Sequence, residues 1–143
     1  MVISTQEDLF LRMPDGWMDK SVIILSAPPR ADRAFPPSFV VTRCALNEGE
    51  TVEAYADRAL YECAQQFDGF ELIERPHVRI ANRTARSILY RWQSPRGSVT
   101  QHQVYVGGKD GTVLCLTASA LTTLYERERA LFEEVFDSVR LPG

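Results

Sequence analysis

Two short apolar runs open the chain, separated by a turn, and the second run shows no alternation of apolar and polar residues. Residues 9–13 form the first run, Pro14-Asp15-Gly16 follows, and Ser21–Leu25 forms the second. Proline's fixed φ and glycine's freedom at positive φ are typical of a turn, so the pattern predicts a strand on each side of it. A strand that is covered on one face alternates, whereas residues 22–25 are all apolar. We therefore expect both faces of the second strand to be covered.

A proline-rich segment and a helical repeat come next. Residues 27–37 contain four prolines, which lack a backbone donor and disfavour helix in the preceding residue, so this segment is predicted to be a surface connection. Ser38–Ala45 is predicted as a further strand, again with a centre that does not alternate. From Thr51 to Phe67 apolar residues recur every three or four positions. This spacing predicts an amphipathic helix, and Thr51 suits its N-cap.

The second half of the chain contains strand-like runs joined by turn residues, which predict meander hairpins. We expect these strands at residues 70–74, 78–80, 84–93, 99–106 and 112–117. Between Leu121 and Val139 the apolar positions return to a helical spacing. This order of elements predicts an α+β fold, in which a mainly antiparallel twisted sheet has two long helices packed on it. The 143 residues suit a single domain spanning 1–143.

The strands without alternation raise the question of what covers the second face of the sheet. If both helices cover one face, four strand residues are buried there: Ile23, Leu25, Phe39 and Val41. Three apolar neighbours then point to the opposite face: Val22, Ile24 and Val40. Leaving a Val or Ile exposed forgoes about 1.5–3 kcal/mol per side chain. We therefore expect a second layer of the same chain, a second subunit or a ligand on that face.

Charge and terminal sequence restrict the class of protein. The formal net charge is -3 and the basic residues are scattered singly, which argues against a nucleic-acid-binding protein. The N-terminus lacks the basic start and apolar segment of an export signal, and no apolar run approaches the roughly 20 residues that span a bilayer. We therefore expect a cytoplasmic protein without stable membrane insertion.

Candidate chemical groups are present but do not form a recognisable catalytic or metal motif. Cys44, Cys63 and Cys115 are far apart without CxxC spacing, so we expect small buried hydrophobic side chains rather than disulfides or a zinc site. His77 and His102 are the only histidines, and neither has an adjacent nucleophile pattern or metal-ligand spacing. The sequence therefore predicts a protein that is not an enzyme and that uses neither a metal nor a cofactor.

One predicted strand, residues 99–106, combines apolar and amide side chains on a single face. Alternation places Val99, Gln101, Gln103 and Tyr105 on that face. Glutamine side chains among aliphatic residues can offer hydrogen bonds to a peptide ligand, and exposure of an edge to water explains the same glutamines equally well.

Several segments together resemble the DcrB-related proteins, and among them the Eag chaperones of type VI secretion. The segments are residues 13–21 followed by an apolar strand, Ser38–Arg43, Phe67-Asp-Gly-Phe70, Tyr90–Gln93 and Gln103-Val104. The resemblance implies a Mog/PsbP-like sandwich that assembles as a homodimer with an apolar groove. It further implies an adaptor that holds the hydrophobic N-terminal transmembrane helices of a PAAR or Rhs effector in the cytosol until they are loaded onto the secretion spike.

Transferred to this sequence, the resemblance assigns six residues to a partner-binding groove: Val22, Ile24, Val40, Val99, Gln101 and Gln103. The implied partners are the N-terminal transmembrane region of a secreted effector and a second copy of the chain, with no nucleic acid. The alternative that the sequence leaves open is a small-molecule or lipid-binding module of the same fold.

Overall fold

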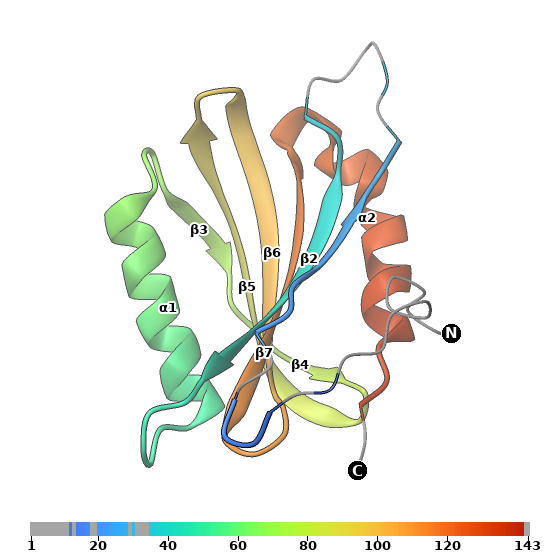
Figure 1. Cartoon of the computed structure of the whole chain (residues 1–143). Coiled ribbons are helices and arrows are strands. Elements are labelled where there is room, and N and C mark those ends of the chain that lie inside the picture. Colours follow the sequence, from blue (N-terminus) through green and yellow to red (C-terminus); the bar gives the residue numbers. More distant parts are fainter. Residues whose placement is uncertain (1–11, 13, 18–19, 29, 31–34, 142–143) are drawn as a thin grey trace.

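The computed structural model describes residues 12, 14–17, 20–28, 30 and 35–141, which form one seven-stranded sheet and two helices (Figure 1). The elements in chain order are β1 Ile23–Ser26, β2 Ser38–Ala45, α1 Val52–Gln66, β3 Glu71–Glu74, β4 His77–Ile80, β5 Arg83–Ser94, β6 Gly97–Gly107, β7 Thr112–Leu121 and α2 Thr122–Ser138. The α+β class is confirmed. The strand predicted at residues 9–13 lies outside the described residues except for Arg12.

The strand order is β1-β2-β7-β6-β5-β3, with β4 also paired to β5, and every described pairing is antiparallel. β5, β6 and β7 form the expected meander. β2 pairs with β7 along its whole length, so the early strands join the sheet beside the last one. β7 continues to Leu121, although its hydrophobic pattern predicts an end at Thr117, because Ala118, Ser119 and Ala120 keep pairing with β6.

Local sequence explains the bounds of α1. Its N-cap is Thr51, whose side chain accepts a hydrogen bond of 3.0 Å from the amide of Ala54. Glu53 lies in the first turn, where a negative charge interacts favourably with the helix dipole. The helix ends at Gln66, before Gly69 adopts a φ of 62° that suits glycine.

The two helices lie on opposite faces of the sheet (Figure 1). α1 packs on Ile88, Tyr90, Tyr105 and Val113, whereas α2 packs on the residues that alternate with them. The expectation that both helices cover one face is therefore wrong. Helical spacing identifies the apolar side of each helix but does not say which face of the sheet it meets, and the central strands carry apolar residues on both faces.

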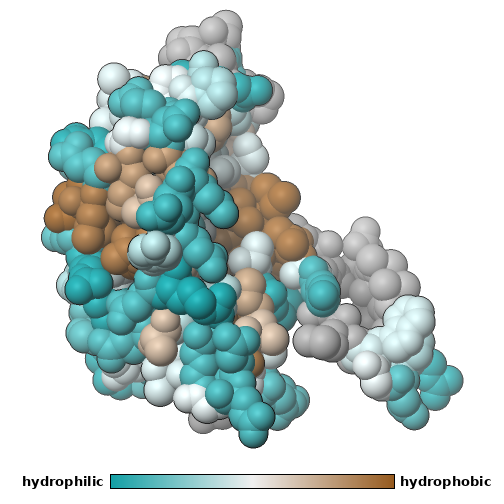
Figure 2. Space-filling model, turned by 90° about the vertical axis from the view of Figure 1, so that its left-hand side faces the viewer, coloured by the Kyte–Doolittle hydropathy of each residue, from teal (hydrophilic) through white to brown (hydrophobic). Residues whose placement is uncertain are grey.

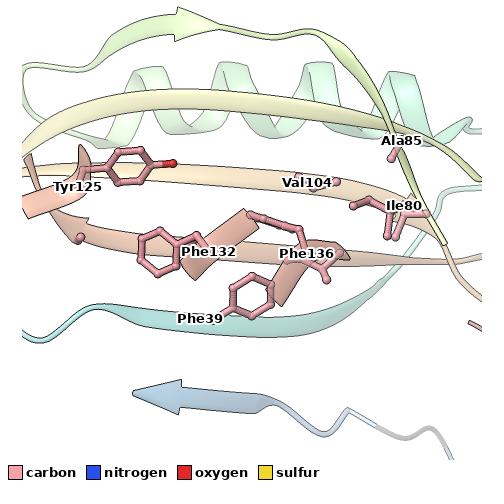
Figure 3. Close-up of a cluster of buried hydrophobic side chains, with 11 residues drawn as sticks. Phe39, Ile80, Ala85, Val104, Tyr125, Phe132 and Phe136 are labelled. Carbon is pink, nitrogen blue, oxygen red and sulfur yellow. The ribbon is translucent and has the colours of Figure 1, made fainter. Parts of the chain in front are cut away.

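The core under α2 is the larger apolar cluster (Figure 3). Phe132 and Phe136 of α2 point at the sheet, and the ring of Phe136 meets the edge of Phe39 with centroids 5.0 Å apart. Leu131, which the spacing places on the buried side, is 53% exposed. Leu25 and Ile23 do share the α2 face, because they pair with Phe39 and Val41, but they are only partly covered.

Candidate binding surface

A row of register partners crosses the sheet on the α1 face. Ile24 of β1 pairs with Val40, Val40 with Thr117, Thr117 with Gln103, and Gln103 with Ile88. Directly opposed residues point to the same side of a sheet, so the predicted site residues Ile24, Val40 and Gln103 share one face. The chain thus brings together residues that are far apart in the sequence.

A second row runs beside the first and is more polar. Ser38 pairs with Ser119, Ser119 with Gln101, and Gln101 with Tyr90. Ser119 and Thr117 were not among the predicted site residues. The hydrophobic pattern ends β7 at Thr117, so it gives no reason to place Ser119 beside Gln101, whereas the register does.

Coverage by α1 is uneven along these rows. Its apolar side buries Ile88 and Tyr90 at the β5 end, whereas at the β1 end Ile24 is 63% exposed and Val22 is 49% exposed. Figure 2, which views the molecule from the α1 side, shows hydrophobic areas on both sides of a mainly hydrophilic central region. We call the surface formed by Ile24, Val40, Thr117 and Gln103 on this face, together with Val22 directly before β1, the open face.

Val99 occupies the same face but is 1% exposed. Its register partner is Trp92, and the ring of Phe67 stacks on Trp92 with centroids 4.4 Å apart. Val99 therefore contributes to the interior of the chain and offers no surface to a partner in this conformation.

The two predicted glutamines hold their amides differently. Gln101 Oε1 accepts hydrogen bonds from the Tyr90 hydroxyl at 2.7 Å and from Trp92 Nε1 at 3.0 Å, and its Nε2 donates to Ser119 Oγ at 2.8 Å. Gln103 Oε1 accepts a hydrogen bond from the Tyr105 hydroxyl, and the side-chain amide of Gln103 also lies beside the Tyr90 hydroxyl. An amide has two acceptor and two donor positions, so Gln103 keeps an acceptor and a donor for another molecule.

The three cysteines lie near the contact between α1 and the sheet, half-buried and free. Burial raises the pKa of the Cys63 and Cys115 thiols. Raised pKa values keep these thiols protonated at neutral pH, which is the form that does not act as a nucleophile or metal ligand.

The histidines lie on different parts of the sheet and each contacts a structural partner. His77 Nε2 lies 3.1 Å from Glu53 Oε1 near the N-terminus of α1, and His102 Nε2 lies 2.6 Å from Ser87 Oγ on the α2 face. Among the described residues, His, Cys, Asp and Glu side chains do not cluster in a way that suits a metal ion. Neither described helix has both the length and the hydropathy of a membrane-spanning segment.

Comparison with known proteins gives the family. Residues 9–138 match the sequence model of the DcrB family. The chain belongs to the DcrB family. One protein similar in sequence to this DcrB protein is effector EagT6 from Pseudomonas aeruginosa. It is 27% identical over 120 residues, and the alignment covers 84% of this chain and 83% of the relative.

Solved structures show the same fold as this DcrB protein. A Pseudomonas aeruginosa protein described as a putative regulator of unknown function superimposes with a TM-score of 0.82 at 23% identity, covering 93% of this chain and 91% of that one. PsbP of the cyanobacterium Synechocystis gives a TM-score of 0.58 at 13% identity, covering 91% and 84%. The predicted PsbP-like fold is therefore confirmed.

Proposed function

We propose that this DcrB protein is a cytoplasmic adaptor chaperone of type VI secretion. It binds and shields the hydrophobic N-terminal transmembrane helices of a PAAR or Rhs-type effector before they are loaded onto the secretion spike. The observation that carries the proposal is the open face, where Ile24 of β1 and Val22 directly before it stay 63% and 49% exposed, in a chain similar to EagT6.

The composition of the open face suits a transmembrane helix as client. Such a helix is apolar, and its packing surfaces carry small residues and hydroxyl or amide groups that hydrogen-bond across the contact. Val22, Ile24 and Val40 supply apolar contact, and Gln103 supplies an amide with a free acceptor and donor. The open face therefore matches both parts of the client surface.

The shape of the open face favours a homodimer. A helix with its side chains is about 10–12 Å across, and the open face is one side of four neighbouring strands that are about 4.8 Å apart. One face of a sheet covers only one side of a helix. A second copy of the chain supplies the opposite side, and this arrangement requires neither catalysis, nucleic acid nor stable membrane insertion.

The test is co-expression of the full chain with the N-terminal region of the effector encoded beside it. The double variant Val22→Asp plus Ile24→Asp is expected to lose the soluble complex while keeping its own thermal unfolding midpoint, because both side chains are already largely exposed. Leu131→Asp is the matched control, since Leu131 is an equally exposed apolar residue on α2. An effector that stays soluble and bound with the double variant would exclude the open face as the client site.

The alternative of a small-molecule or lipid-binding module is tested in the same preparation. Two cavities of the described chain, with volumes of about 530 and 320 Å³, lie on the α2 side and are lined by charged and apolar residues together. Several charged side chains line each cavity, whereas a purely aliphatic ligand favours a predominantly apolar lining. Native mass spectrometry that finds a retained lipid on a monomer would favour the alternative over the chaperone.

A further inference from the structure

Helix α1 has two long sides with different surroundings. On one side Glu53 and Asp57, one turn apart, face β4 and β5. On the other side Tyr55 lies beside Cys44 of β2 and its ring is 5.8 Å from that of Tyr105. The second side borders the open face. The position of α1 across the sheet therefore decides how much of that face stays uncovered.

Arg86 of β5 is the buried cation beneath α1. It is 7% exposed, its Nη1 lies 2.6 Å from Glu53 Oε1, and its Nη2 lies 3.5 Å from Asp57 Oδ1. Both of these carboxylates belong to α1. Its Nε is buried without a hydrogen-bond partner among the described residues. A buried charge is tolerated only while its partners stay in place, so Arg86 ties the side of α1 away from the open face to the sheet.

Two further side chains contact the same carboxylates from outside. Arg75 Nη1 lies 3.5 Å from Asp57 Oδ1, and His77 Nε2 lies 3.1 Å from Glu53 Oε1. The hydrogen bond from His77, followed by the charges of His77 and Arg86, lowers the pKa of the Glu53 carboxyl. Glu53 is therefore ionised at neutral pH and available to pair with Arg86.

The other end of α1 is held by apolar contacts. Phe67, directly after the helix, stacks on Trp92 with centroids 4.4 Å apart and lies 6.0 Å from Tyr90. Stacked rings keep a favourable contact at several offsets, whereas Arg86 has to keep its two guanidinium nitrogens near two separate carboxylates of α1. The first two turns also pack Tyr55 against Tyr105, and the ion cluster adds a directional contact that holds this end of the helix on the side of β4 and β5.

We propose that Arg86 is a positioning residue that sets where α1 stands over the sheet and so fixes the width of the open face. The part of this inference that concerns a client rests on the proposed function. The part that concerns α1 stands on the ion cluster alone.

The experiment compares amide hydrogen exchange in the full chain and in Arg86→Met, which keeps an unbranched side chain similar to the aliphatic portion of arginine and removes the charge. Amides of α1 are expected to exchange at least about tenfold faster, while those of β6, β7 and α2 stay within about twofold. Arg91→Met is the matched control, because Arg91 is on the same strand but pairs with Glu71 of β3 instead of α1. It is expected to leave α1 exchange unchanged.

The double variant Glu53→Gln plus Asp57→Asn covers the case in which Arg86→Met does not fold, because both acidic residues are more than half exposed. It is expected to accelerate exchange in α1 as well. Unchanged α1 exchange in the variants that fold, or equal acceleration throughout the sheet, would overturn the positioning role.

The same variants separate this inference from the proposed function. Effector binding is expected to weaken at least about tenfold in the variants whose α1 exchange is faster. Faster exchange with unchanged binding would overturn the link between α1 and the open face. If Val22→Asp plus Ile24→Asp leaves effector binding intact, the proposed function fails, while the exchange result still decides whether Arg86 positions α1.

Discussion

Ser87 and His102 are joined by a hydrogen bond of 2.6 Å between Ser87 Oγ and His102 Nε2, beneath α2. Ser87 is 2% exposed, and the imidazole packs against Phe136 with ring centroids 4.9 Å apart. Charged groups reach His102 from two elements, Glu74 of β3 and Arg129 and Glu133 of α2. The imidazole thus lies between the sheet and the helix, where a positive charge is poorly solvated.

This burial predicts a pH dependence of stability. Burial, reinforced by the charge of Arg129, lowers the pKa of His102 below the ordinary value of 6.5. In the unfolded chain His102 takes up a proton first as the pH falls, so the free energy of unfolding decreases below about pH 6.5 and is level above it. Urea denaturation between about pH 5 and 8 measures the slope, and His102→Gln is expected to reduce it.

The paired carboxylates titrate below the pH range of this experiment. Hydrogen bonds from arginine and histidine lower the pKa values of Glu50, Glu53 and Glu71 below 4.5, so the stability that they contribute is lost only under more acidic conditions. His77→Gln serves as the control, since it removes the other imidazole of the chain. An equal slope for His102→Gln and the unsubstituted chain would contradict the prediction.

Gln101 is predicted to matter for stability. Gln101→Leu leaves the Tyr90 hydroxyl and Trp92 Nε1 without their acceptor. A buried donor left unsatisfied costs about 1–3 kcal/mol. The loss of the acceptor for two such donors is therefore expected to lower the free energy of unfolding more than the loss of the acceptor for one donor. Gln103→Leu deprives only the Tyr105 hydroxyl of its acceptor and is expected to cost less. Chemical denaturation of the two variants in parallel checks the order, and a larger loss for Gln103→Leu would reverse the assignment.

Gln103 is predicted to matter for client binding. Gln103 forms part of the open face and its amide keeps an acceptor and a donor, so under the proposed function Gln103→Leu removes a hydrogen bond to the client while keeping an apolar side chain of similar size. Interhelical polar contacts contribute about 0.6–1.7 kcal/mol, which corresponds to a loss of affinity of roughly three- to twentyfold. Titration of the effector's N-terminal peptide in detergent-free buffer measures this loss. Gln93→Leu, at an exposed position of β5, is the control. Equal affinities of the unsubstituted chain, Gln103→Leu and Gln93→Leu for the peptide would exclude a role of Gln103 in client binding.

Local patterns in the sequence predicted several elements well. β2 has the bounds Ser38–Ala45 that its apolar run indicates, and Thr51 caps α1 as its side chain and the following helical spacing predict. These features depend on residues that are close together in the sequence, so the sequence alone is enough to predict them. The PsbP-like fold came from the resemblance of the motifs and not from these patterns.

Long-range arrangement was less accessible from the sequence. The spacing of apolar residues did not show that α1 and α2 lie on opposite faces, because each helix has one apolar side whichever face it meets. Val99 alternates correctly with Gln101 and Gln103 but is buried, because Trp92 and Phe67 come together only in the folded chain. The place of Ser119 beside Gln101 depends on strand register, which pairs residues from separate parts of the chain. The assignment of the site residues to a client stays a prediction.

Phe39 and Phe136 are predicted to act as a coupled pair in the core. Each is nearly fully buried, and their rings meet at 5.0 Å, so replacing either by Ala is expected to lower the free energy of unfolding by about 3–5 kcal/mol. The double variant should lose less than the sum, because residues in contact share a cavity and an interaction energy of about 0.5–3 kcal/mol. Leu131→Ala on the same helix is the control, with an expected change within about 0.5 kcal/mol since the side chain is largely exposed. Strict additivity of the two Phe variants would mean that α2 is not held to β2 through this ring contact.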